Sequence, residues 1–243
     1  MTAPGTPHPA GQDKWEQWWA GLDGTPGEVV WDADPADLEA DLGCFAGSLD
    51  PALPVVDFGC GDGRQTRYLA GRFPHVVGTD ISAAAIRRAR AASNPPNVTF
   101  QVLDARDMDG AARLHDELGD ANVYIRGVLQ ALPPACRPGA VQIIAALLGA
   151  AGTLFAKELP PEASSYFADM TQQYGMPPTL AKLMRTIPPG QISLPELSEL
   201  FPANRFEVLD TGTSRIRTVN SLPGGVVISV PAIWILTRPR RES

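Results

Sequence analysis

Residues 55–63 read Val-Val-Asp-Phe-Gly-Cys-Gly-Asp-Gly, a short apolar strand that runs directly into a glycine-rich turn. Glycines at this position let the backbone turn sharply and approach a ligand closely. The spacing differs from the dinucleotide fingerprint, and no Gly-Lys-Ser/Thr follows as it would in a P-loop. Ligands of open α/β sheets bind beyond the carboxyl ends of the strands, so this turn is the first candidate for a binding site.

The chain around this turn alternates between strand and helix patterns. Apolar runs end at residues 80, 104, 126 and 158, and helical segments separate them. Strands that alternate with helices predict an α/β fold with a parallel, doubly wound sheet. Residues 205–209 and 232–236 are expected to be the last two strands.

Three of these strands carry an aspartate at or near the carboxyl end, at nearly equal spacing: Asp57, Asp80 and Asp104. A carboxylate after the second strand can accept hydrogen bonds from both hydroxyls of a ribose. A carboxylate after the third can accept one from an adenine amino group. Each aspartate alone is more often a solvated strand end, but the three together, beside a glycine-rich turn, indicate a nucleoside site.

These stretches resemble the class I S-adenosylmethionine-dependent methyltransferases. The resemblance is carried by residues 55–63, by Gly78-Thr79-Asp80-Ile81-Ser82 and by Leu103-Asp104-Ala105, and it spans about residues 50–240. It implies a Rossmann-like sheet of seven mostly parallel strands, with helices on both faces and the last strand antiparallel. It also implies S-adenosylmethionine as cofactor and S-adenosylhomocysteine as product.

The resemblance also implies the residues that bind the cofactor. Asp57 would organise the glycine-rich loop, Ile81 would pack against adenine, and Ala105 would supply a backbone amide. Arg126, at the end of the fourth strand, would lie near the methionine end. The full set of expected cofactor-binding residues is Trp31, Asp57, Gly59, Cys60, Gly61, Gly63, Asp80, Ile81, Asp104, Ala105 and Arg126.

The segment before the sheet is rich in tryptophan. Trp15, Trp18 and Trp19 recur at helical spacing, and Trp31 is followed by Asp32. This layout is loosely similar to the thiopurine-methyltransferase-like branch, in which a Trp-Asp pair helps cover the cofactor. A lid of this kind would attract a sulfonium cation to its aromatic faces. The alternative is that the tryptophans pack the helix onto the sheet.

Methyl transfer from an activated donor needs mainly proximity and alignment, and it needs a base only when the acceptor holds its proton tightly. The stretch 127–132, where the family often has a histidine, contains none. The candidates for catalysis are therefore Glu158, Arg126 and Gln130. Glu158 would act as a base or substrate anchor, or else as an ion-paired strand end. Arg126 would bind an acidic group, or else form a salt bridge with Asp57 or Glu158.

We expect three regions: a disordered leader at 1–12, an N-terminal helical cap at 13–49, and a core at 50–243 with a helical insertion at 160–195. Such an insertion would hang over the site. The expected substrate contacts are Trp19, Tyr166, Met170 and Tyr174, with packing as the alternative for each.

Composition excludes several classes of function. A net charge of −7 is unsuited to nonspecific nucleic-acid binding or to an anionic membrane. The Asn94-Pro95-Pro96 stretch precedes the third strand and lacks the terminal aromatic residue of nucleic-acid amino-methyltransferases. The cysteines, Cys44, Cys60 and Cys136, form neither a disulfide framework nor a zinc site, so no metal is expected. With no recognisable signal peptide, the expected location is the cytoplasm.

The resulting hypothesis is a methyltransferase for a small, fairly hydrophobic molecule, in natural-product tailoring by analogy with such enzymes. One alternative is a cyclase or pericyclase of polyketide biosynthesis that binds the cofactor without transferring its methyl group. Another is a noncatalytic protein that only binds the cofactor. The sequence leaves the acceptor molecule, the acceptor atom and the oligomeric state open.

Overall fold

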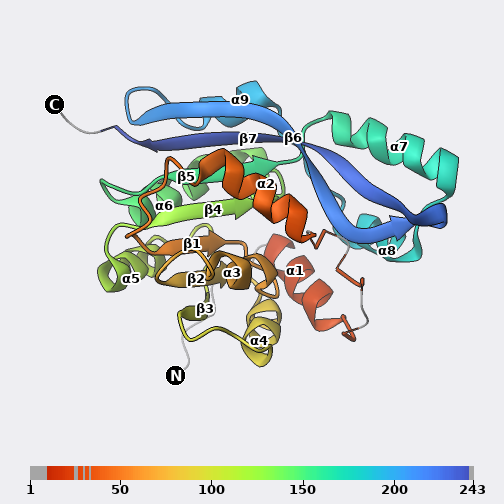
Figure 1. Cartoon of the computed structure of the whole chain (residues 1–243), viewed down its shortest axis with the longest axis horizontal. Helices are drawn as coiled ribbons and strands as arrows, with labels where there is room; N and C mark the ends of the chain where they lie inside the picture. The colour runs from red at the N-terminus through yellow and green to blue at the C-terminus, as the bar shows by residue number, and fades with distance from the viewer. Residues whose placement is uncertain (1–9, 25–26, 30, 33, 241–243) are drawn as a thin grey trace.

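The computed structural model describes residues 10–24, 27–29, 31–32 and 34–240, and it has one sheet of seven strands in the order β3-β2-β1-β4-β5-β7-β6 (Figure 1). The strands are β1 (Val55–Phe58), β2 (Val76–Asp80), β3 (Val98–Val102), β4 (Asn122–Arg126), β5 (Leu154–Glu158), β6 (Phe206–Leu222) and β7 (Val226–Pro239).

Strands β1 to β5 pair in parallel, whereas β7 runs antiparallel to both β5 and β6. The order reverses at β1, whose two neighbours are β2 and β4. This is the switch point at which open α/β sheets bind ligands. The predicted Rossmann-like sheet with an antiparallel last strand is confirmed.

Helices cover both faces of the sheet. One apolar core packs α5, α6 and α9 against the strands, and the other packs α2, α3 and α4. The helices are α1 (Ala10–Ala20), α2 (Pro35–Phe45), α3 (Arg64–Leu69), α4 (Ala83–Ala91), α5 (Met108–Leu118), α6 (Arg137–Leu148), α7 (Glu162–Tyr174), α8 (Pro178–Thr186) and α9 (Leu194–Glu199), with short 3-10 turns at Pro134–Cys136 and Pro223–Gly225. No helix in the described ranges is long and apolar enough to cross a membrane.

Local sequence explains where several helices begin. Asp34 caps α2 by accepting a hydrogen bond from the Asp37 amide at 2.8 Å, and Pro35 takes the first helical position. Ser82 caps α4 in the same way. Helix α1 begins at Ala10, so residues 10–12 of the expected leader are helical. The rest of the leader lies outside the described residues.

The last two strands are much longer than predicted. They run for 17 and 14 residues and form a twisted hairpin that extends past the sheet towards α7 and α8 (Figure 1). We call residues 214–232, the part beyond the β5 pairing, the arm. Between Arg217 and Ser221 the register shifts, so three residues of β6 lie opposite Ile228.

Candidate active site

A cavity of about 380 Å³ lies beyond the carboxyl ends of the parallel strands. The loops after β1 to β4 form its core side. Helix α8, residues 187–190 and the arm form the opposite side, and tryptophans of the N-terminal cap line it as well. A deep, largely apolar cleft with a few polar groups is typical of a small-molecule site.

The glycine-rich turn brings bare backbone to the cavity wall. Gly59 and Gly61 both line the cavity and both have positive φ, at +85° and +57°. A Cβ on Gly59 would lie 2.2 Å from the Val128 side chain, and one on Gly61 would lie 2.7 Å from the Trp19 ring. Only glycine therefore allows both this conformation and this close approach.

Asp80 holds the turn from the end of β2. Its carboxylate accepts hydrogen bonds from the backbone amides of Gly61, at 2.9 Å, and Ser82, at 2.8 Å. Burial raises the pKa of Asp80 to about 6. Asp80 and Ile81 both line the cavity, as the ribose and adenine roles require.

Three residues of the expected cofactor set support the turn instead of lining the cavity. Asp57 is buried and accepts a hydrogen bond from the Thr66 hydroxyl at 2.5 Å, while burial raises its pKa to about 7. The Cys60 thiol is buried and points to the Gly61 carbonyl. Gly63 begins α3, and a Cβ there would meet the Phe100 ring at 2.5 Å. Asp57 therefore supports the turn from behind, and Cys60 and Gly63 do not line the cavity. Their contact with the cofactor stays a prediction.

Asp104 and Ala105 line the cavity after β3, next to a residue that sequence reasoning missed. Arg106 also lines it and forms a two-pronged ion pair with Asp104, its Nε lying 2.9 Å from Oδ1. The two Asp104 oxygens have more lone pairs than Arg106 uses, so they can still accept from an adenine amino group.

Three tryptophans surround Trp31. Its ring lies 5.8 to 5.9 Å from the rings of Trp15, Trp18 and Trp19. Trp15, Trp19 and Trp31 line the cavity, while Trp18 is buried in the apolar cluster behind them. Trp18 therefore packs behind the cavity, and a lid made of the other three tryptophans stays a prediction.

One carboxylate fastens α1 to the core. Glu16 accepts hydrogen bonds from the Ser82 hydroxyl at 2.7 Å and the Ala84 amide at 3.0 Å, at the start of α4. Although burial acts to raise its pKa, these hydrogen bonds and Arg87 lower it overall. The tryptophan-bearing helix is thus held next to Asp80.

The side chain of Glu158 turns away from the cavity. It is fully buried and accepts hydrogen bonds from the backbone amides of residues 128–130 at 2.9 to 3.2 Å. Burial raises its pKa to about 7. Glu158 therefore holds the loop after β4 and does not line the cavity, and its role as a base stays a prediction.

Gln130, the last residue of that loop contact, does line the cavity. Its Oε1 accepts a hydrogen bond from the Leu159 amide. This bond leaves the Gln130 Nε2 group without a partner in the described part of the chain. An amide donor is thus available at the cavity wall.

Arg126 also lines the cavity, but neither salt bridge considered for it is present. Its Nη1 donates to the Trp31 carbonyl and its Nη2 to Asp37, both at 3.0 Å. Asp37 belongs to α2, so this arginine joins the sheet to the N-terminal cap.

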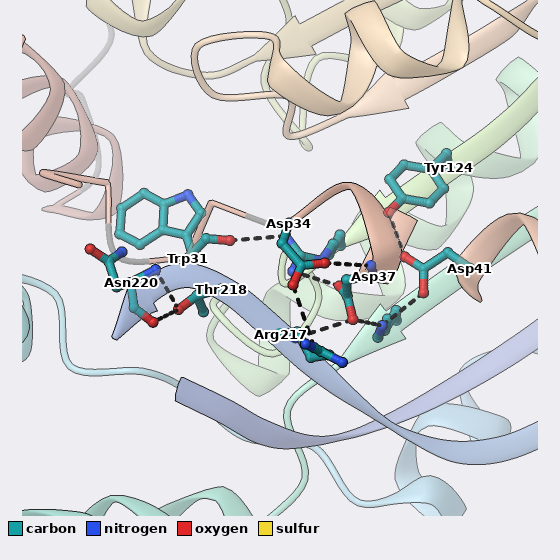
Figure 2. Close-up of polar contacts among 10 residues, drawn as sticks. Trp31, Asp34, Asp37, Asp41, Tyr124, Arg217, Thr218 and Asn220 are labelled. Carbon is teal, nitrogen blue, oxygen red and sulfur yellow. Dashed lines mark hydrogen bonds and ion pairs between the residues drawn. The ribbon is translucent and has the colours of Figure 1, made fainter. Parts of the chain in front are cut away.

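Asp37 is part of a buried charge cluster that we call the α2 junction: Asp37, Asp41, Tyr124, Arg126 and Lys157 (Figure 2). Lys157 donates to Asp37 at 3.2 Å and to Asp41 at 2.7 Å, and Asp41 also accepts from the Tyr124 hydroxyl. Sequence reasoning missed this cluster. The signal in the sequence was the position of Tyr124 and Lys157 within apolar strand patterns. A lysine at such a position is expected to be buried, and a buried lysine requires a partner.

The expected substrate contacts divide in a similar way. Trp19 lines the cavity, whereas Tyr166, Met170 and Tyr174 do not. The Tyr166 hydroxyl accepts a hydrogen bond from the Ser229 amide at 2.9 Å, and Met170 is buried. These residues pack α7 against the arm and its surroundings, and their contact with substrate stays a prediction.

The lining residues missed on this side come from α7, α8 and the arm. They are Phe167, Thr179, Leu180, Leu183, Ile216, Thr218, Asn220, Ser221, Ile228 and Val230, and Ile187 follows directly after α8. None of the described residues that these three elements contribute to the lining has a titratable side chain.

Comparison with known proteins gives matches to the core and to the whole chain. A family model described as "Methyltransferase domain" matches residues 55–152. A solved S-adenosylmethionine-dependent methyltransferase from Anabaena variabilis is 31% identical, with a TM-score of 0.84 over 99% of both chains. A structure described as "Conversion of a Disulfide Bond into a Thioacetal Group during Echinomycin Biosynthesis" has a TM-score of 0.68 at 20% identity, over 96% of this chain and 94% of that one.

A curated relative matches a shorter stretch. A trans-aconitate 2-methyltransferase from Deinococcus radiodurans is 41% identical over 81 residues, which are 32% of this chain and 28% of that protein. The chain therefore spans less than a third of the curated relative that it matches.

Proposed function

This chain belongs to the class I S-adenosylmethionine-dependent methyltransferases, and we propose on that premise that it methylates a small, largely apolar molecule held between α8 and the arm. The observation that carries the proposal is the division of the cavity. Charged groups line its core side, whereas the opposite side is apolar with a few neutral polar groups. An acceptor molecule that fills this apolar side of the cavity would bury mostly hydrocarbon surface.

The residues of the core side fit the cofactor. Gly59 and Gly61 bring bare backbone to the cavity wall, and a Cβ at either position would collide with Val128 or Trp19. Asp80 would take the ribose hydroxyls, Asp104 the adenine amino group, and Trp31 would cover the sulfonium. When bound, the cofactor supplies a methyl group that is already activated for displacement.

The chain itself would contribute positioning rather than proton transfer. The apolar side of the cavity offers no base among its described residues. Gln130 would orient a polar atom of the acceptor through its free amide group, and the tryptophans and apolar residues would exclude water. Alignment of this kind can supply most of the acceleration.

A role in natural-product tailoring is supported by the apolar chamber and by the fold neighbour described in echinomycin biosynthesis. The trans-aconitate relative is similar to only 32% of this chain, so its name supports methyl transfer in general more than a particular acceptor. We place the reaction in the cytoplasm, a reducing compartment that suits three cysteines that form no disulfide.

The test measures cofactor binding by calorimetry. Asp80→Ala removes the acceptor of both ribose hydroxyls and should weaken S-adenosylhomocysteine binding by about 10- to 100-fold. The exposed α5 variant Asp116→Ala is the control and should bind as the wild type does. Equal affinity of Asp80→Ala and wild type would contradict the proposal.

A second measurement follows the methyl group. The enzyme is incubated with S-adenosylmethionine and a panel of apolar phenols, amines and carboxylic acids, and mass spectrometry detects methylated products. A methylated product is the expected result. Tight cofactor binding with no methylation across the panel would favour the cyclase alternative.

A further inference from the structure

The side-chain amide of Gln130 has one paired end and one free end. Its Oε1 accepts a hydrogen bond from the Leu159 amide. A backbone N–H can only donate, so the oxygen of the side chain must face Leu159 and the Nε2 group must face the other way. Gln130 is only 7% exposed, and its Nε2 group donates to no atom in the part of the chain that the structure describes.

The free Nε2 group reaches the cavity. The Nε atom of Arg126 is enclosed by protein atoms, whereas the Gln130 nitrogen is in contact with open space. Gln130 lines the cavity, and so does Gly127, on which a Cβ would lie 3.8 Å from this nitrogen. A donor that is left unpaired in a largely buried side chain costs free energy, and a ligand in the cavity can supply its missing acceptor.

The direction of this donor is fixed from both sides. The Gln130 backbone amide donates to Glu158 at 3.0 Å, so the end of β5 holds both the backbone and the side chain of Gln130. On the other side, Gly190 packs so closely that a Cβ on it would lie 1.8 Å from the Gln130 carbonyl oxygen. The side-chain amide cannot exchange its oxygen and nitrogen, because two N–H donors would then face each other at Leu159.

The surroundings of the donor favour a neutral ligand group. Leu159 and residues 187–190, which lie next to Gln130, are apolar, and both arginines of the described cavity lining already pair with aspartates. An anionic group at Gln130 would lose its hydration and find no free counterion, which is costly. A cationic amine has no lone pair with which to accept a hydrogen bond from Nε2.

We propose that Gln130 is a specificity-determining residue, and that the molecule methylated here presents a neutral oxygen, of a ketone, alcohol or phenol, to its Nε2 group. The inference rests on the proposed function, because it assumes an apolar acceptor in the same cavity. The oxygen would fix one point of the acceptor at the end of β4, next to the turn after β1. The apolar body of the acceptor would extend from there towards α8 and the arm.

Four ligands of similar size test this inference on the protein loaded with S-adenosylhomocysteine. Calorimetry measures the binding of 2-octanone, of 2-octanol, of the cationic 2-aminooctane, and of 2-methyl-1-octene, in which a methylene group replaces the ketone oxygen. The ketone and the alcohol should bind about five- to tenfold more tightly than the alkene, as one buried hydrogen bond predicts. Equal binding of ketone and alkene would leave the proposed function standing and overturn the oxygen subsite. If none of the four binds, both fail.

Two variants assign the preference to Gln130. Gln130→Leu removes the donor and should reduce the preference for the ketone over the alkene to less than about twofold. Gln130→Glu keeps an oxygen for the Leu159 amide but turns the free end of the side chain into an acceptor. At pH 8 it should therefore prefer 2-aminooctane over 2-octanone, the reverse of the wild-type order. A folding defect would weaken all four ligands without reversing their order, and a wild-type order in both variants would overturn the role of Gln130.

The control is Gln142→Leu, which makes the same substitution at an exposed position of α6 and should leave all four affinities unchanged. The affinity for S-adenosylhomocysteine distinguishes the acceptor from the cofactor as the partner of Nε2. It should change by less than about twofold in Gln130→Leu. A tenfold loss of this affinity would mean that the amide serves the cofactor, and the inference would be overturned.

Discussion

At the scale of single residues, Gly61 sets how closely the Trp19 ring approaches the turn after β1. The Trp19 ring lies where a Cβ of residue 61 would be. The need for glycine at residue 61, in the core, is therefore linked to the position of the Trp19 side chain in the N-terminal cap.

Replacing Gly61 by alanine should therefore do two kinds of damage. The positive φ should cost about 1 kcal/mol, and displacement of Trp19 should bring the total loss of unfolding free energy to about 2–3 kcal/mol. Binding of S-adenosylhomocysteine should weaken about tenfold. Gly224→Ala is the matched control, because Gly224 has a φ of +81° and a ψ of 7° with open space around it. Urea unfolding measures the free energy of unfolding and calorimetry measures ligand binding. Equal losses of both quantities in the two variants would contradict the effect of the Trp19 contact.

Residues at strand ends differ in how well the sequence predicts them. Asp80 and Asp104 are predictable, because the carboxyl end of a parallel strand places a side chain at the ligand edge. Glu158 also ends a strand, yet its side chain turns to the amides of residues 128–130. The direction of the Glu158 side chain depends on the conformation of the loop at residues 128–130. Hydrophobic periodicity in the sequence does not predict the conformation of a loop.

At the scale of elements, α1 and the arm approach the same cavity from different parts of the chain. The tryptophan stripe predicts α1 because one face of the helix is apolar. The arm is not predictable, because residues 210–221 have polar side chains at most positions and show no alternation. The α2 junction escapes prediction for a related reason: its five members come from three elements far apart in sequence.

The attachment of α1 should control how fast the cofactor leaves. Glu16→Ala removes the acceptor of the Ser82 hydroxyl and the Ala84 amide, which should cost about 1–2 kcal/mol of docking free energy. The dissociation rate of S-adenosylhomocysteine, followed by tryptophan fluorescence in a stopped-flow instrument, should rise about tenfold. Gln17→Ala changes an exposed neighbour and should leave the rate unaltered. An unchanged rate in Glu16→Ala would mean that α1 does not retain the ligand.

At the scale of the whole molecule, the sheet order and the helical layers follow from the alternating patterns and from the resemblance, because each strand–helix unit has a strong local signal. The cavity does not follow in the same way. The apolar wall of the cavity depends on how far the β6–β7 hairpin extends beyond the sheet. That length is set by tertiary packing and not by a local sequence pattern.

Buried carboxyls should make the stability of the whole protein fall with rising pH. Glu158 keeps its proton to about pH 7 when folded but loses it near 4.5 when unfolded. The folded state therefore binds more protons between these values, and its stabilisation is complete below pH 4.5 and lost as the pH rises through 7. Asp57, with a pKa of about 7, and Asp32 and Asp80, with pKa values of about 6, act in the same direction.

Urea unfolding at pH 5.0 and 7.5 measures this effect. The unfolding free energy of wild type should be lower at pH 7.5, with Glu158 contributing up to about 3 kcal/mol. Glu158→Gln cannot titrate, so its decline over this range should be shallower than that of wild type. A wild-type free energy of unfolding that stays constant or rises with pH would contradict the raised pKa values of these buried carboxyls.

The place of β7 has a consequence for how the protein is made. This strand follows β6 in the chain but lies between β5 and β6 in the sheet. During synthesis, β6 has no strand to pair with until residues 226–239 emerge from the ribosome, and the edge of β5 stays open for as long. Unpaired apolar edges are sites of aggregation. A chain truncated after residue 225 would contain every loop of the proposed nucleoside site. We nevertheless expect the truncated chain to precipitate or to require a chaperone.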